Sequence, residues 1–562
     1  MQVKLKRKLK EKDGYSSNQI ISTSLRNLCY NHSERQMKKI NFSRACSEIS
    51  ESLLQIVEPT KSQAKSEIKR VCTKYSLDRI PKNYEILATV NGRSYEKLQN
   101  VLLKKPVKTA SGVAVVALMA KPYACPHGRC TYCPGGLEFN TPNSYTGKEP
   151  LTISAIENQY EPKGQIAEKI EKLQKYGHDI TKIELVIAGG TFLFMPQDYQ
   201  TKFIKSCYDT LNGFESADLE TAKKENELAK IRNVGFTVET KPDYCKKEHI
   251  DLMLSYGVTR VEIGIQSLHE RVYEIVNRGH DYDDVIDSFQ ISKDSGYKIV
   301  AHMMPGLPTM TPKDDIHDFK KLFNDSELKP DMLKIYPSLV LKNTALYDDF
   351  IAKKYMPYSD EEMLTVLTEV KKMVPKWVRI MRIQREITSS EIQAGPKSGN
   401  LRQIIHKRLK DQGYSCKCIR CREAGLSRKN MQTEFLKLNR QEYDSSNGRE
   451  IFISFDDKDE SIYGFLRLRK PSELAHRNEI TQNSCIVREL HVFGKSIKIG
   501  NHEEDGIQHS GLGRKLMNEA EKISKEDFDS QKLLVISAVG TREYYKKLGY
   551  SLDGPYMSKQ LR

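Results

Sequence analysis

The chain has 562 residues, enough for about three to four domains, and 38% of them are hydrophobic, so it can bury several cores. No stretch approaches the ~20 consecutive apolar residues of a membrane-spanning helix, and the first residues, MQVKLKRKLKEK, lack the apolar core of a secretory signal. These features exclude a membrane-spanning protein and argue against a secreted one. We therefore expect a cytoplasmic protein whose 12 cysteines are reduced.

The formal net charge of +16 favours a polyanionic partner, because Lys and Arg side chains neutralise phosphates and release counterions. Residues 1–80 begin with six Lys or Arg against one Glu in the first twelve residues, and a segment of helical pattern lies at 44–57. A basic tail is often only a solvated arm, but residues 401–430 carry another nine basic residues against two acidic ones. The pattern therefore predicts a basic helical N-terminal region and a nucleic-acid partner.

Six apolar, strand-like runs alternate with charged segments of helical period over residues 81–390. The runs are GVAVVALMA (112–120), KIELVIAGG (182–190), VGFTVET (234–240), VTRVEIGIQ (258–266), YKIVAHMMPG (297–306) and MLKIYPSLV (332–340). Such alternation predicts an α/β fold with a parallel sheet and right-handed crossovers. Six units are too few for a closed eight-stranded barrel, so we expect a partial (β/α)6 barrel with its chemistry at the carboxyl ends of the strands.

The first cysteine group, Cys125, Cys130 and Cys133, follows the first of these strands in the segment KPYACPHGRCTYCPGG (121–136). Three thiolates can hold three irons of a [4Fe–4S] cluster and leave the fourth iron open. A zinc site that is completed by His127 is the alternative. The preceding strand and the Pro- and Gly-rich loop favour the cluster.

The second cysteine group, Cys416, Cys418 and Cys421, lies in the basic linker 391–430. Its close spacing predicts a structural zinc site with a fourth ligand from elsewhere, for which His406 is a candidate. Basic residues surround this group and predict part of an RNA-binding face. They are Lys417, Arg420, Arg422, Arg428 and Lys429.

A different domain is predicted over residues 431–562. Three strands come in series, as in an antiparallel sheet, and are followed by a helix, a strand and a short helix. These segments are REIFISFDD, SIYGFLRLRK, CIVRELHVFG, GLGRKLMNEAEKIS, KLLVISAVG and TREYYKKLG. The turn QHSGLGRKL, with Gln508, Gly511 and Gly513, opens the long helix, where free backbone N–H groups and the helix dipole favour an anion.

A cysteine triad after the first strand of a partial barrel resembles the radical S-adenosylmethionine enzymes. Their commonest spacing is Cys-x3-Cys-x2-Cys, whereas this chain has Cys-x4-Cys-x2-Cys within CPHGRCTYCPGG. That pattern resembles the catalytic subunit of Elongator and its single-chain archaeal and bacterial relatives, and the short spacing is similar to the archaeal form. The resemblance continues through SYTGKEP, AGGTF, VETKPDYC, EIGIQS, NRGHD, AHMMPGLP and KIYPSLV. One departure is Lys241, where the family often has Arg.

For the barrel, the resemblance implies that the open iron binds S-adenosylmethionine and that an external electron donor reduces the cluster. The loop AGGTF, with Gly189, Gly190 and Thr191, resembles the family's binding loop for the methionine moiety. Glu239 is a further candidate for S-adenosylmethionine binding, and His302 lies near a strand end at the same barrel mouth.

The C-terminal region resembles the acetyltransferases of the GCN5-related (GNAT) fold, which implies an acetyl-CoA site. The candidate residues for this cofactor are Lys182, Glu489, Leu490, His491, Val492, Gln508, Gly511, Leu512, Gly513, Arg514 and Tyr545. Glu489 and Tyr545 are the catalytic candidates, with Glu489 one possible base for thioester hydrolysis. Ordinary packing is the alternative for Tyr544 and Tyr545.

Together the resemblance implies an enzyme that installs a carboxymethyl group on C5 of the wobble uridine, position 34, of tRNA. A 5′-deoxyadenosyl radical would take hydrogen from the acetyl methyl group, and the resulting carbon would add to C5. Two alternatives are a protein lysine (histone) acetyltransferase and a non-catalytic RNA-binding scaffold with structural metals. A homodimer or Elongator-like partners are further expectations.

Overall fold

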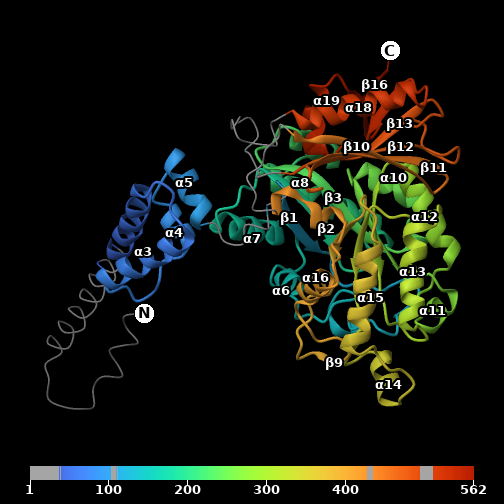
Figure 1. Cartoon of the computed structure of the whole chain (residues 1–562), viewed down its shortest axis with the longest axis horizontal. Coiled ribbons are helices and arrows are strands. Elements are labelled where there is room, and N and C mark those ends of the chain that lie inside the picture. The colour runs from blue at the N-terminus through green and yellow to red at the C-terminus, as the bar shows by residue number, and fades with distance from the viewer. Residues whose placement is uncertain are drawn as a thin grey trace, which may run out of the picture. The chain divides into compact units, whose positions relative to one another are not determined.

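The computed structural model of the protein describes residues 37, 40–102, 109, 112–426, 435–493 and 511–561 (Figure 1). The chain divides into two compact units, one up to Pro106 together with Leu173–His178, and one that contains the remainder. Within the described ranges, every helix is too short or too polar to cross a membrane. The basic segment 1–12 lies outside these ranges.

The N-terminal unit is helical where it is described. Residues 40–55 are helical, and α3 (Lys61–Lys74), α4 (Asn83–Leu87) and α5 (Gly92–Leu102) follow. A capping box starts α3: the hydroxyl of Thr60 accepts from the backbone N–H of Gln63 at 3.2 Å, and Gln63 Oε1 accepts from Thr60 N–H at 2.8 Å. The buried apolar faces of these helices form one core, which includes Ile49, Leu53 and Leu98.

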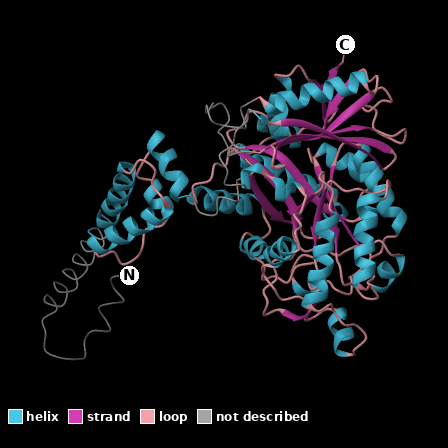
Figure 2. Ribbon diagram, viewed as in Figure 1, coloured by secondary structure: helices cyan, strands magenta, loops and turns pink. Residues whose placement is uncertain are grey.

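The second unit is built on a parallel sheet of seven strands, in the order β1-β2-β3-β4-β5-β6-β8 (Figure 2). The strands are β1 (Ala114–Met119), β2 (Lys182–Ala188), β3 (Arg232–Thr240), β4 (Arg260–Gln266), β5 (Lys298–Met303), β6 (Met332–Ile335) and β8 (Arg379–Arg382). The six predicted strands are confirmed, and β1 and β8 form the two edges, so the partial barrel is confirmed as well. The predicted number of strands was one too low, because RIMR in β8 is short and half charged.

Helices join successive strands of this sheet and cover its outer face. They are α6 (Pro150–Glu157), α7 (Pro162–Lys175), α8 (Gln197–Asn212), α9 (Leu219–Asn226), α10 (Lys247–Ser255), α11 (Glu270–Ile275), α12 (Tyr282–Asp294), α13 (Pro312–Asn324), α14 (Ala345–Ile351) and α15 (Asp360–Met373). The predicted strand 332–340 is corrected by the structure: β6 ends at Ile335, two residues before Pro337. Val340 instead belongs to β7 (Val340–Leu341), which pairs antiparallel with β9 (Ile392–Ala394).

A linker follows the parallel sheet and covers its β8 edge. It contains α16 (Leu401–Asp411) and α17 (Ile419–Arg422). Arg402 of α16 donates to the backbone oxygens of Ile380 and Met381 in β8 at 3.1 and 3.3 Å, and Ile419 N–H donates to Val378 O at 3.0 Å. The backbone of the last parallel strand is therefore hydrogen-bonded on its outer side as well.

The C-terminal part forms a second seven-stranded sheet, in the order β10-β11-β12-β13-β14-β16-β15, in which only β13 and β14 are parallel. Its elements are β10 (Lys437–Ser445), β11 (Gly448–Asp456), β12 (Ile462–Lys470), β13 (Ser484–Val492), α18 (Leu512–Glu526), β14 (Lys532–Val535), α19 (Arg542–Lys546), β15 (Ser551–Asp553) and β16 (Tyr556–Gln560). The sequence did not predict β10, β15 or β16. The apolar face of α18, with Leu516 and Met517, packs into the core of this sheet.

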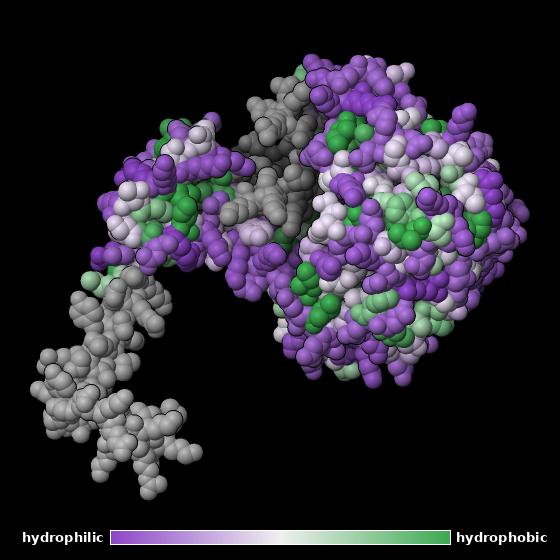
Figure 3. Space-filling model, turned by 90° about the horizontal axis from the view of Figure 1, so that it is seen from below, coloured by the Kyte–Doolittle hydropathy of each residue, from purple (hydrophilic) through white to green (hydrophobic). Residues whose placement is uncertain are grey.

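Figure 3 shows a mainly hydrophilic surface in which hydrophobic residues gather in small, separate patches. This pattern agrees with a chain in which 29% of the residues are charged. The face in this view thus presents no broad apolar area of the kind that marks a large protein interface.

A buried network of charges joins the two sheets. Arg488 of β13 donates to both carboxylate oxygens of Asp331, which precedes β6, at 2.8 and 2.6 Å, and to Glu450 at 2.8 Å. Arg469 of β12 reaches Asp294 at 2.6 Å in the same layer. All five side chains are almost fully buried. Burial alone would raise the pKa of Asp331, but Arg488 and Arg467 outweigh it and hold this pKa well below its usual range.

The substitution Arg488→Met tests this network. It leaves Asp331 and Glu450 buried without their shared partner, so we expect the free energy of unfolding to fall by about 3–5 kcal/mol in denaturant titrations. The control is Arg449→Met, which removes an exposed arginine that pairs with Asp444 at 2.9 Å. Its loss is expected to stay below about 1 kcal/mol. Equal losses for the two variants would contradict the structural role of the buried network.

Candidate metal and cofactor sites

The loop after β1 brings Cys125, Cys130 and Cys133 together at the carboxyl ends of the parallel strands. Cys130 and Cys133 are buried, and Cys133 Sγ accepts from the backbone N–H of Ser144 at 3.1 Å. Arg278 Nη1 lies 3.7 Å from Cys130 Sγ. Burial and the neighbouring thiols raise the pKa of Cys125 to about 11. The Cys125 thiol is therefore protonated unless a metal displaces its proton, as is usual for metal ligands.

The spacing of the sulfurs bears on which metal the triad could hold. A tetrahedral zinc with Zn–S bonds of about 2.3 Å holds its thiolates about 3.8 Å apart. In the described part of the chain, two groups of His, Cys, Asp or Glu have all their ligand atoms within 4.8 Å, and the Cys125–Cys130–Cys133 triad is not one of them. The three sulfurs are thus not all as close as the ligands of one zinc ion, and the [4Fe–4S] assignment stays a prediction.

His127 and Lys241 stand beside the triad. His127 Nε2 lies 3.3 Å from Cys130 Sγ, and its Nδ1 lies 3.0 Å from Lys241 Nζ. Lys241 is buried and pairs with Asp243 at 3.0 Å. Burial, together with Arg278, lowers the pKa of Lys241. The lysine that departs from the family pattern is therefore an interior residue that contacts His127 within the cysteine loop.

The glycine loop after β2 lies at the same end of the sheet. Gly189 and Gly190 have φ values of 114° and 102°, which favour glycine. A Cβ at Gly189 would lie 3.1 Å from Met119 and 3.2 Å from Pro142. The N–H of Gly189 donates to Glu239 Oε2 at 3.3 Å. Two of the residues that the resemblance assigns to S-adenosylmethionine are thus in direct contact, and Thr191 directly follows Gly190.

Sequence reasoning missed two charged residues inside the barrel mouth, Glu262 of β4 and Lys334 of β6. Glu262 is buried, forms an ion pair with Lys334 and lies 3.0 Å from His302 Nε2. Burial opposes its charge, but Lys334 and His302 lower its pKa below the usual range. Glu239, Glu262 and His302 form one of the two compact ligand groups, in which the ammonium of Lys334 already supplies a positive charge. The sequence signal that could have identified Glu262 and Lys334 was that each is a charged residue within an apolar, strand-like run.

Cys416, Cys418 and Cys421 form the other compact group, and their sulfurs lie within 4.8 Å of one another. His406 Nε2 of α16 lies 3.5 Å from Cys421 Sγ. Burial and the charge of Lys371 lower the pKa of His406 to about 4, which keeps its imidazole neutral, as a metal ligand must be. Three thiols and one imidazole match the donor set of a structural zinc.

The basic residues around this group differ in exposure. Arg422 is buried and pairs with Asp456 at 2.7 Å, so it does not contribute to an exposed RNA-binding face. Lys417 pairs with Glu460 at 2.5 Å. Arg428 and Lys429 lie outside the described residues.

The C-terminal sheet opens where the acetyl-CoA residues are predicted. The strands β13 and β14 pair only from Ser484 to Val487, so the β14 side of Glu489–Val492 has no strand partner in the described ladder. The helix α18 begins after Gly511, which has a left-handed φ of 78°. Leu512, Gly513 and Arg514 form its first turn, whereas Gln508 lies outside the described residues.

The two catalytic candidates have well-defined surroundings. Glu489 accepts from Arg467 Nε at 2.8 Å. Burial disfavours its charge, but Arg467 and Lys298 lower its pKa, which makes it a weak base. Tyr545 is buried in the sheet core, whereas Tyr544 is 39% exposed. Packing therefore accounts for Tyr545, and the catalytic roles of Glu489 and Tyr545 stay predictions.

Lys182 lies at the amino end of β2, in the layer where the C-terminal part packs on the neighbouring strand β3. Lys182 starts β2 and is paired in register with Arg232 of β3. A Cβ at Gly540 would lie 2.6 Å from the Cβ of Arg232, so the turn before α19 packs closely on this strand. Lys182 is thus the register partner of a residue that the C-terminal part contacts, and its role beside acetyl-CoA stays a prediction.

Comparison with known proteins gives consistent matches. The Radical SAM superfamily model matches residues 121–322, the Radical SAM C-terminal domain 330–411, and the ELP3 N-terminal domain 42–110. The tRNA uridine(34) acetyltransferase of Methanocaldococcus jannaschii is 45% identical over 86% of this chain and 90% of that protein. Human Elongator complex protein 3 is 40% identical over 92% of this chain and 97% of that protein.

A solved structure supports the same likeness. The archaeal Methanocaldococcus infernus Elp3 with an N-terminal deletion matches with a TM-score of 0.71 and 41% sequence identity. The match covers 81% of this chain and 100% of that chain.

The substitution Gly189→Ala tests the glycine loop. Its new methyl group meets Met119 and Pro142 in a strained backbone conformation, so we expect a loss of about 1–3 kcal/mol in the free energy of unfolding. The matched control is Gly213→Ala, which also has a positive φ but no atom within 4 Å of its Cβ. The difference between the two losses measures the close packing alone. A smaller loss at Gly189 than at Gly213 would contradict that packing.

Proposed function

Because this chain belongs to the family that contains archaeal tRNA uridine(34) acetyltransferases and Elongator complex protein 3, we propose that it is an enzyme that modifies the wobble uridine of tRNA. The product is a carboxymethyl group on C5 of uridine 34. The observation that carries this proposal is the pairing, within one compact unit, of a thiol triad at the barrel mouth with a second sheet whose strand β13 lacks a partner beside the helix that follows Gly511.

The radical site comprises Cys125, Cys130 and Cys133 as ligands of a [4Fe–4S] cluster. Gly189, Gly190, Thr191 and Glu239 are the residues for S-adenosylmethionine. When bound, these groups and an external electron donor supply a radical that can take hydrogen from the methyl group of acetyl-CoA. The chain itself contributes the positive charges of Arg278 and Lys241, which favour the thiolates at this site.

The acetyl-CoA site lies on a GNAT-type C-terminal domain. The free side of Glu489–Val492 offers backbone groups to the pantetheine arm, and the first turn of α18 offers N–H groups to the pyrophosphate. Gly513 supports this proposal, because any Cβ there would lie 2.8 Å from the hydroxyl of Tyr544. Lys182 completes the site from the parallel sheet.

The linker holds a structural zinc through Cys416, Cys418 and Cys421, with His406 as the fourth ligand. The net charge of +16 and the basic N-terminal region favour tRNA as the macromolecular partner. We further propose that the enzyme acts in the cytoplasm, as a homodimer or with Elongator-like partners.

Mass spectrometry of tRNA nucleosides tests the proposed reaction. After anaerobic incubation with reductant, S-adenosylmethionine and acetyl-CoA, we expect uridine 34 to gain the mass of a carboxymethyl group. Omission of acetyl-CoA and the variant Cys130→Ser are each expected to abolish this gain.

Three other outcomes of this experiment would contradict the proposal. No mass gain with a spectroscopically intact cluster would reject the reaction. Acetyl transfer to a lysine peptide that Cys130→Ser leaves unchanged would support the protein acetyltransferase instead. No cleavage of S-adenosylmethionine under reducing conditions would support the RNA-binding scaffold.

Metal analysis of two cysteine variants tests the assignment of the two metals. We expect Cys130→Ser to lose most of its iron and keep its zinc, and Cys421→Ser to lose zinc and keep iron, because the two groups bind independently. His406→Ala is expected to weaken zinc binding in the same direction as Cys421→Ser. Loss of iron from Cys421→Ser, or unchanged zinc in both linker variants, would contradict these assignments.

A further inference from the structure

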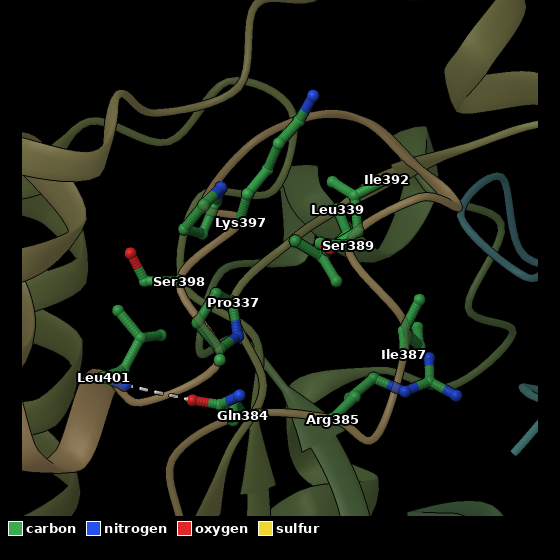
Figure 4. A pocket seen from close by; sticks show the side chains of 12 residues that line it. Pro337, Leu339, Gln384, Arg385, Ile387, Ser389, Ile392, Lys397, Ser398 and Leu401 are labelled. Atoms are coloured by element: carbon green, nitrogen blue, oxygen red, sulfur yellow. Dashed lines mark hydrogen bonds between the residues drawn. The ribbon is translucent and has the colours of Figure 1, made fainter.

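A pocket lies among the segments that follow strands β6 and β8 of the parallel sheet (Figure 4). Its walls come from the segment after β6, the segment after β8 and the start of α16. The space that it encloses is about 150 Å³, and an apolar cavity of that size admits one benzene-sized ring. The residues that line it are Pro337, Leu339, Gln384, Arg385, Ile387, Ser389, Ile392, Pro396, Lys397, Ser398, Gly399 and Leu401.

The pocket is adjacent to the thiol site but separate from it. Arg385 lines the pocket, and its guanidinium lies 5.8 Å from the ring centre of Tyr145. The neighbouring Ser144 donates its backbone N–H to Cys133. Arg385 and Tyr145 thus stand between the pocket and the cysteine loop. A ligand in the pocket would be next to the reacting group rather than in its place.

Two cations of this pocket lack acidic partners. Neither Arg385 nor Lys397 forms an ion pair with a carboxylate among the described residues. The nearby acids are already paired, Glu386 with Arg382 at 3.2 Å and Glu391 with Lys148 at 3.1 Å. Two uncompensated positive charges at a concave site favour an anionic ligand.

The remaining walls of the pocket are mainly apolar, and the side-chain amide of Gln384 adds a polar group. Pro337, Leu339, Ile387, Ile392 and Leu401 form apolar surfaces, and Figure 4 shows Gln384 between the loop and α16. Gln384 Oε1 accepts from Leu401 N–H at 3.2 Å, which holds its side-chain amide in place. A nucleotide combines a planar base that could lie between apolar walls with a phosphate that a cation neutralises.

We propose that this pocket binds one nucleotide of the single-stranded RNA loop, next to the uridine that reacts. The base lies against the apolar walls, and its phosphate lies at the rim, within reach of Lys397 or Arg385. This inference rests on the proposed function, because it takes the reacting uridine to lie at the triad. The pocket would position the RNA loop and would separate the reacting uridine from the neighbouring base.

Charge reversal at the pocket rim tests the phosphate contact. Lys397 is exposed, so Lys397→Glu is expected to fold normally. We expect it to weaken binding of an anticodon stem-loop RNA by about fivefold or more and to reduce the salt dependence by about one phosphate contact. The matched control is Lys202→Glu on the outer face of α8, which is also exposed. Equal weakening by both variants would overturn the proposal.

A crosslinking experiment tests the base contact without any turnover. A stem-loop RNA with 4-thiouridine at the residue next to position 34 is irradiated with the full-length protein, and the crosslinked peptide is identified by mass spectrometry. We expect a crosslink within residues 384–401 that Ser398→Trp, which fills the pocket, reduces. Crosslinks only at other segments would overturn the proposal.

The same samples separate this inference from the proposed function. Formation of 5′-deoxyadenosine from S-adenosylmethionine without RNA is expected to be unchanged in Lys397→Glu. Should the wild-type protein modify no uridine but still give the 384–401 crosslink, the proposed function fails and the pocket stands as an RNA site. Modification without that crosslink overturns the pocket alone. Binding of free uridine monophosphate as tightly as the stem-loop would overturn the assignment to an RNA loop.

Discussion

The buried contact between Arg488 and Asp331 determines which ends of the parallel strands the C-terminal sheet covers. It holds the C-terminal sheet against the amino ends of the parallel strands, where Asp331 precedes β6. The opposite, carboxyl ends are thereby left to the cysteine loop and the glycine loop. Since six residues of strand span about 20 Å, the two candidate cofactor sites lie roughly one strand length apart. In the proposed reaction, the acetyl group and the radical would therefore have to meet across the barrel interior.

Much of the fold could be predicted because its signals are local. The apolar runs of the parallel strands and the apolar face of α18 depend on residues close together in the chain. The strand β8 was missed because RIMR has only four residues and two charges, and β10 because its exposed residues are mostly polar. Such strands form because a neighbouring strand pairs with them, which no local pattern records.

The residues of the candidate sites likewise include some that a local sequence pattern reveals and others that depend on distant partners. The cysteine groups and the glycine turns could be identified from spacing and residue type. Glu262, Lys334 and Arg488 could not, because each charge is acceptable only with a partner that comes from a distant strand. His406 could be named only as a candidate ligand for the second cysteine group, and its place beside Cys421 needed coordinates, because it depends on how α16 packs on the linker.

The linker over β8 has a consequence for the behaviour of the protein in solution. An uncovered edge strand offers a row of unpaired backbone groups to another chain, and it is a common starting point for aggregation. Here Arg402 and the segment that carries the second cysteine group take up that edge. A metal that holds these cysteines together would therefore keep the linker on the β8 edge and prevent that edge from pairing with another chain. Such a metal would favour solubility even though it lies away from the barrel mouth.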